Sequence, residues 1–172
     1  IGAQAGEAIT TQNENTLVGN YAGQDLTGQY NVFLGSSAGF NATNSDNNVA
    51  VGRQALGAST GASNTAMGYR AGDVITTGSN NVVIGATADA SVDTAQNQIV
   101  IGYGATGTGN NEIALGNTSI SAIKAQVTSI TAYSDRRIKR EINNSKIGLD
   151  FIMKLRPVSY KMKNPADYPD EI

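Results

Sequence analysis

One short pattern of polar and apolar positions recurs along most of the chain. Asn is followed by three mostly apolar residues, then by Gly, and by Ala three positions later, as in "NTAMGYRAG" (64–72) and "NVVIGATAD" (81–89). A constant period of this size is typical of stacked repeats, and each unit is too short for a helix pair. The pattern therefore predicts a parallel β-solenoid with one coil per phrase. The glycines that align the phrases lie 14 to 17 residues apart: Gly2, Gly19, Gly35, Gly52, Gly68, Gly85, Gly102 and Gly116.

The three residues before each aligning glycine are expected to form a strand, because β-branched side chains recur three positions before the glycine. Side chains alternate between the two faces of a strand. If this alternation continues through the glycine, the side chains one and three positions before it lie on the same face as the Ala three positions after it. We expect this face to line the interior of the solenoid. The middle strand residues would then point outward: Leu17, Phe33, Ala50, Ala66, Val83, Val100 and Ala114.

These middle residues are apolar, so a solenoid that exposed them would need a partner on its outer face. No helix pattern interrupts the repeats to provide that cover, and a second copy of the chain is the economical partner. Cyclic symmetry about a long axis would produce a fibre or a stalk. The sequence thus predicts a homo-oligomer with Leu17, Phe33, Val83 and Val100 at or near subunit contacts.

The recurring Asn suits a corner, since Asn tolerates left-handed backbone and bonds its own turn. Stacked Asn side chains can also form an amide ladder. Cation or glycan binding is the functional alternative, but no acidic residue recurs beside them at fixed spacing. The glycine predicts a tight corner with positive φ. The Asn positions are Asn15, Asn31, Asn48, Asn64, Asn81, Asn97 and Asn111.

The phrase resembles the head repeats of trimeric autotransporter adhesins and, still more, the Asn-Thr-x-x-Gly-x-x-Ala-Gly repeats of phage tail fibres. The resemblance covers residues 1–117 and implies a left-handed parallel β-roll in a trimer. It does not indicate what such a fibre contacts. The chain begins in the middle of a phrase and without Met, so we expect it to be part of a longer protein.

The charge balance and the pattern of residues both change near Tyr133. Residues 1–133 carry three basic and eight acidic side chains, whereas residues 134–172 carry nine basic and six acidic ones. The absence of Cys and His argues against disulfides and a zinc site, and we expect no metal or cofactor. Neither half has a basic stripe with interleaved aromatic residues, and no apolar run is long enough for a membrane span, so nucleic acid and membrane insertion are not expected.

The repeat stops after Gly116, and residues 118–133 are predicted to form a neck. Ile120, Ile123, Val127 and Ile130 have the spacing of a coiled coil. The β-branched, Ser and Thr content favours an extended β neck instead. Residues 134–172 follow as a small α+β segment, in which "KIGLDFIMKL" predicts an amphipathic helix ended by Pro157 and "VSYKM" predicts a strand.

Within this last segment, "SDRRIK" followed by "GLDFIMKLRPVSY" resembles the start of the intramolecular chaperone domain of endosialidase tailspikes. In that family the domain assembles the trimer and then cuts itself off just before the Ser. The resemblance implies a cut at Tyr133–Ser134, with Ser134 as nucleophile and Lys139 as general base, supported by Asp135 and Arg137. From chemistry alone, a Ser and a Lys five residues apart are a weak signal.

The implied reaction is one self-cleavage per chain without an external substrate. Lys139 must be neutral to accept a proton, which requires burial or nearby cations to lower its pKa. Direct attack of Ser134 on the preceding carbonyl, an N-to-O acyl shift, is the other route. The sequence does not separate the two.

These features together predict the distal part of a trimeric phage-type tail fibre, extracellular on the virion tail and involved in host attachment. Its partners would be other tail-fibre or baseplate proteins and a host surface receptor, with a glycan as one class. A bacterial surface adhesin or a fibre of a contractile injection system is the first alternative. A polysaccharide-degrading tailspike is less favoured, because the acids of the repeats share no common position.

Overall fold

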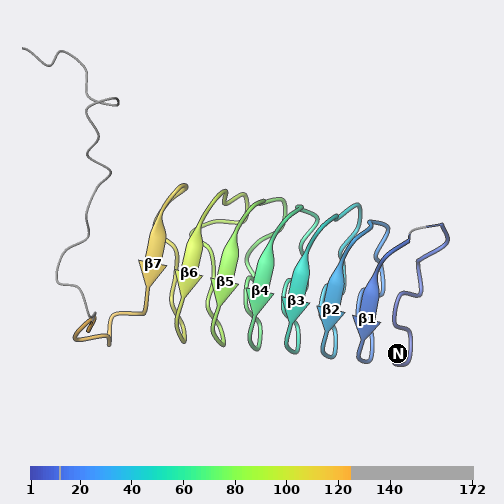
Figure 1. The fold of residues 1–172 in the computed structure, drawn as a ribbon, viewed down its shortest axis with the longest axis horizontal. Coiled ribbons are helices and arrows are strands. Elements are labelled where there is room, and N and C mark those ends of the chain that lie inside the picture. The colour runs from blue at the N-terminus through green and yellow to red at the C-terminus, as the bar shows by residue number, and fades with distance from the viewer. Residues whose placement is uncertain (12, 125–172) are drawn as a thin grey trace, which may run out of the picture. The chain divides into compact units, whose positions relative to one another are not determined.

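The computed structural model of the protein describes residues 1–11 and 13–124. The described residues form a β-solenoid, in agreement with the predicted fold class (Figure 1). Every strand has three residues, and each strand pairs in parallel with the next one in sequence, so that β1 and β7 are the edges of the sheet. The strands are β1 (Thr16–Val18), β2 (Val32–Leu34), β3 (Val49–Val51), β4 (Thr65–Met67), β5 (Val82–Ile84), β6 (Ile99–Ile101) and β7 (Ile113–Leu115).

The register of the sheet follows the repeat residue for residue. Phe33 pairs with Ala50, Ala50 with Ala66, and Ala66 with Val83, so each strand position stacks on the same position of the next coil. The variation in repeat length is therefore absorbed outside the strands. A parallel sheet of this kind places chemically equivalent side chains in columns along the stack.

The two faces of the strands are the reverse of the sequence-based prediction. The middle residues Phe33, Ala50, Val83 and Val100 are fully buried inside the solenoid, and Leu17 packs against the same core. The residues on either side of them point outward instead. The predicted burial of the Ala three positions after the glycine is confirmed, since these alanines are fully buried in six coils: Ala22, Ala38, Ala55, Ala71, Ala88 and Ala105.

The backbone at the corner explains this reversal. Gly35, Gly52 and Gly68 have φ of 137°, 134° and 137°, and the residue two positions later lies in the left-handed region, as in Gln54 with φ of 60°. The alternation of an extended strand does not continue through two such residues, so counting parity across the corner is invalid. Glycine is also required by close stacking, because a Cβ atom on Gly35 would lie 2.6 Å from the carbonyl carbon of Gly52.

The predicted amide ladder is present inside the corner that leads into the strands. Asn48 donates its backbone N–H to Oδ1 of Asn31 at 2.9 Å, and Asn64 donates to Oδ1 of Asn48 at 2.8 Å. The side-chain amide of Asn64 donates in turn to the carbonyl of Gly78 at 2.9 Å. Asn31, Asn48, Asn64 and Asn81 are all fully buried. Each rung thus satisfies backbone groups that water cannot reach.

Two members of the predicted Asn set do not belong to the ladder. Gln98, four residues before Gly102, takes the next rung and donates its backbone N–H to Oδ1 of Asn81 at 3.0 Å. Asn97 and Asn111 lie one position earlier and adopt left-handed backbone, with φ of 52° and 62°. The residue before each rung, rather than the rung itself, is therefore the left-handed corner residue.

Residues 1–124 form one compact unit, to which residues 125–172 do not belong. In the described part of the predicted neck, residues 118–124, the chain forms a turn followed by irregular backbone and no strand. The rest of the predicted neck and the predicted α+β segment lie outside the described residues.

Candidate subunit interface and cleavage segment

The most distinctive surface of the solenoid is the outer strand face, which consists of the side chains one and three positions before each aligning glycine. One column holds Val18, Leu34, Val51, Met67, Ile84, Ile101 and Leu115. The other holds Thr16, Val32, Val49, Thr65, Val82, Ile99 and Ile113. Among these strand positions there is no charged residue, and the only polar ones are two threonines.

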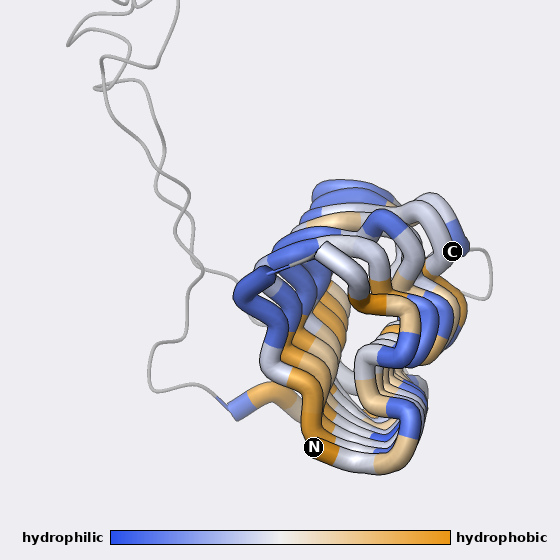
Figure 2. Tube along the Cα trace, turned by 90° about the vertical axis from the view of Figure 1, so that its right-hand side faces the viewer, coloured by the Kyte–Doolittle hydropathy of each residue, from blue (hydrophilic) through white to orange (hydrophobic). Residues whose placement is uncertain are grey.

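Much of this face is open to solvent in a single chain. Val18, Met67 and Ile101 are 43%, 47% and 39% exposed, and most of the other members are half-buried by their neighbours along the column. The strand wall in Figure 2 shows hydrophobic residues stacked from coil to coil. Contiguous apolar surface of this kind marks an interaction site in soluble proteins.

The prediction of which residues make the subunit contacts is therefore wrong. Phe33, Val83 and Val100 are buried within one chain and cannot reach a partner, and Leu17 packs against the core. An outward apolar stripe is present, as expected, but it is formed by the flanking strand positions and not by the middle ones. These flanking side chains, which were predicted to lie in the interior, provide the outward surface.

The wall that follows the corner differs from the strand wall because it carries charged groups. Arg70 and Asp73 form an ion pair, with Nε of Arg70 donating to Oδ2 of Asp73 at 2.9 Å. The side-chain hydrogen bond and the charge of Asp73 raise the pKa of Arg70 above its ordinary value. Both side chains are substantially exposed, so this pair contributes little to stability.

Asp89 occupies a position that is Gly in the preceding coil and in several others. Its carboxylate accepts hydrogen bonds from the backbone N–H of Val74, at 3.0 Å to each oxygen, and from its neighbour Ala90 at 3.0 Å. Burial raises the pKa of the Asp89 carboxyl to about 6, against the lowering effect of these two donors. Asp89 thus links adjacent coils through a carboxylate that is costly to ionise.

All the predicted cleavage residues lie outside the described residues: Tyr133, Ser134, Asp135, Arg137 and Lys139. The Ser–Lys arrangement therefore remains a sequence-based prediction. Within the described residues, no group of three or more His, Cys, Asp or Glu side chains is placed to hold a metal ion. The same part of the chain contains no helix long and apolar enough to cross a membrane.

Comparison with protein families finds a match in this C-terminal segment. Residues 134–171 match Peptidase S74, the chaperone of endosialidase family. The match begins at Ser134, the residue that opens the "SDRRIK" motif. The described solenoid and the matched segment thus occupy different parts of the chain. Comparison with curated proteins and with solved structures gives no match.

Proposed function

We propose that this chain is part of a trimeric fibre of the phage-tail type, in which a β-solenoid shaft is assembled with the help of its own C-terminal chaperone segment. The observation that carries the proposal is the combination on one chain of a parallel β-solenoid and a segment that matches the chaperone of endosialidase family. Attachment to a host surface is the role that we assign to the fibre.

The outer strand face supports the assembly of several copies. Its apolar side chains run the length of the described solenoid without an interrupting charge. Taking a Val, Leu, Ile or Met side chain from full exposure to full burial is worth roughly 1.5–3 kcal/mol, and these partly exposed side chains gain a fraction of that in every coil. Identical chains that pack in parallel present the same column to each other, so a second and a third copy fit this surface.

A chaperone segment addresses a kinetic difficulty of this architecture. Every strand pair in the solenoid joins residues 14 to 17 positions apart, and the proposed contacts between chains require a common register. The pairs within one chain are close in sequence, whereas contacts between separate chains are non-local, so they form slowly and leave aggregation-prone edges exposed meanwhile. Removal of the chaperone after assembly would leave a trimer that is kinetically trapped, because the aid to refolding has gone.

We further propose that the chain cuts itself once between Tyr133 and Ser134. In an N-to-O acyl shift assisted by the predicted base, Ser134 attacks the carbonyl carbon of Tyr133 and Lys139 accepts the hydroxyl proton. The amino group of Ser134 then leaves with the proton that Lys139 returns. Water then hydrolyses the ester that links Tyr133 to the hydroxyl oxygen of Ser134. Lys139 acts only when neutral, which requires that nearby cations such as Arg136, Arg137 and Arg140 lower its pKa.

Expression of the full-length protein with its complete C-terminal domain tests this proposal. The wild type is expected to give two fragments on a denaturing gel, the smaller one beginning at Ser134 by N-terminal sequencing. Ser134→Ala and Lys139→Ala should leave the chain whole but trimeric. Lys139→Arg should not restore the cut, because Arg stays protonated. An uncut wild type, or a fragment that begins elsewhere, would disprove cleavage without affecting the role in assembly.

A further inference from the structure

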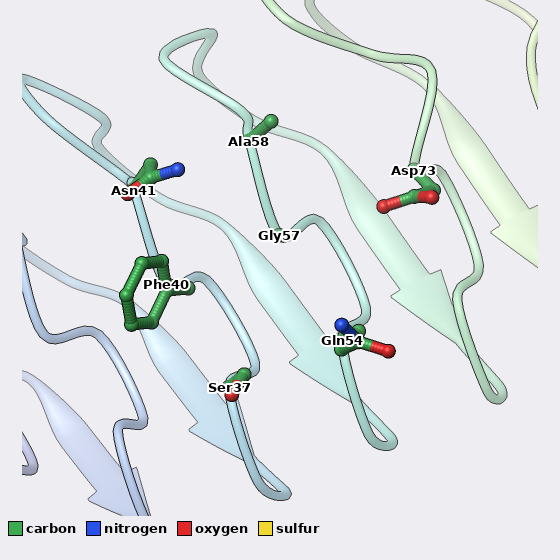
Figure 3. A pocket seen from close by; sticks show the side chains of 7 residues that line it. All are labelled: Ser37, Phe40, Asn41, Gln54, Gly57, Ala58 and Asp73. Atoms are coloured by element: carbon green, nitrogen blue, oxygen red, sulfur yellow. The ribbon is translucent and has the colours of Figure 1, made fainter.

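A groove opens on the wall that follows the corner, on the part of the solenoid that does not contain the strands (Figure 3). Its volume is about 370 Å³, near the small end of the range for ligand pockets, roughly 300–1,000 Å³. Three successive coils contribute to it. The lining residues are Ser37, Phe40, Asn41, Gln54, Gly57, Ala58 and Asp73.

The groove exists because one coil lacks a side chain that its neighbours have. Five residues after the aligning glycine, successive coils carry Gln24, Phe40, Gly57 and Asp73. Gly57 does not have positive φ, and a Cβ atom placed on it would meet its nearest neighbour at an ordinary 3.4 Å. Neither backbone conformation nor close packing therefore requires glycine there. Its effect is to leave a gap between Phe40 on one side and Asp73 on the other.

The lining combines an aromatic ring with polar side chains. The ring of Phe40 is partly exposed and packs edge-to-face with Tyr21, with 6.1 Å between the ring centroids and an angle of 70° between the rings. Within the described part of the chain, the side chains of Ser37, Asn41 and Gln54 make no hydrogen bond. These three groups offer both donors and acceptors toward the gap.

We propose that this groove binds a neutral pyranose ring of a surface glycan. A sugar ring has an apolar C–H face, which suits the ring of Phe40, and a rim of hydroxyl groups, which suits Asn41 and Gln54. The Arg70–Asp73 pair compensates its own charge, so the groove provides no free cation for a phosphate, sulfate or carboxylate. The proposed role in host attachment is used here only to name the source of the glycan, a host surface. The sugar-binding assignment itself rests on the lining of the groove.

Saturation-transfer NMR on the full-length protein tests the assignment, with D-glucose, D-galactose, D-mannose and N-acetyl-D-glucosamine as neutral probes and N-acetylneuraminic acid as the charged one. At least one neutral sugar is expected to receive magnetisation. Gly57→Gln, which fills the gap without backbone strain, should abolish the transfer. Phe40→Ala should weaken it several-fold. Tyr103→Ala, which removes an aromatic side chain that is 73% exposed and does not line the groove, should leave it unchanged.

The assignment is overturned if no neutral sugar responds, if only the charged sugar does, or if the response survives in Gly57→Gln. Melting curves of the variants establish that the solenoid is intact, and Gly57→Gln remains informative if Phe40→Ala does not fold. The native mass separates this result from the fibre proposal. If the protein is a trimer that binds no sugar, only the sugar-binding assignment is disproved. If it is a monomer that binds sugar, only the proposed trimer is disproved.

Discussion

At the scale of single residues, the interior of the solenoid accepts polar groups where their atoms are paired. Ser45 is fully buried, and its hydroxyl accepts a hydrogen bond from the side-chain amide of Asn48 at 2.7 Å. Ser59 is buried to the same degree, but its hydroxyl has no partner, and no other buried side-chain N or O atom of the described residues shares this condition. The two serines therefore form a matched pair with opposite expected effects.

Ser59→Ala is expected to stabilise the protein by about 1 kcal/mol, because it removes a desolvated hydroxyl that makes no hydrogen bond. Ser45→Ala should destabilise it by a similar amount, since it leaves the amide of Asn48 with one acceptor fewer. Thermal melting at a fixed scan rate measures both. If Ser59→Ala melts below the parent, the hydroxyl has a partner that the structure does not show.

Asp89 gives the solenoid a pH dependence of defined sign. Its pKa of about 6 in the folded protein is above the ordinary value of 3.8, so folding favours the protonated form. The contribution to stability is fully present below about pH 4 and is lost as the pH rises through 6. In Asp89→Asn, the difference in melting temperature between pH 4.5 and pH 7 should shift toward higher stability at pH 7. An unchanged pH profile would contradict the role given to burial.

At the scale of the element, each coil combines a three-residue strand with a glycine corner, and the corner decides which strand face is inside. The sequence was sufficient for the repeat, the strands, the buried alanines and the Asn ladder as far as Asn81. It did not give the faces, because Gly52 and Gln54 both leave the extended region and break the alternation. The position of Gln98 was missed because Asn97 lies next to it and resembles the repeat.

The site features that the sequence did not reveal depend on contacts between coils. Gly57 looks like any other glycine of the repeat until the structure shows that nothing crowds it. Asp89 is visible in the sequence as an acid where the previous coil has Gly72, but its hydrogen bond to Val74 requires the stacking register. Side-chain surroundings of this kind cannot be read from periodicity alone.

A charge on the outer strand face tests its role as an interface. Met67→Glu is expected to leave each chain folded but to prevent assembly, because Met67 is 47% exposed in one chain and would be buried in the trimer. Val92→Glu, at 48% exposure outside the strands, is the control and should assemble normally. Ala71→Asp should block folding itself, since it places a charge in the core. Native mass and circular dichroism distinguish the three results. A Met67→Glu trimer as stable as the parent would assign the interface to another wall.

At the scale of the whole molecule, the chain contains a described solenoid and a C-terminal segment with a family match. The solenoid has a covered interior and an uncovered apolar strand face, and residues 134–171 match a chaperone family. The proposed trimer relates the two, since it covers that face and gives the chaperone a task. Parallel assembly of three chains is therefore the claim that connects the solenoid with the chaperone segment.

The native mass of the full-length Ser134→Ala protein tests this claim most directly, because the variant cannot lose its C-terminal segment by the proposed route. Light scattering coupled to size exclusion is expected to give three times the mass of one chain, unchanged on dilution to the lowest measurable concentration. The uncut wild-type sequence should give the same value before cleavage. A folded, stable monomer, or a dimer, would contradict the parallel trimer.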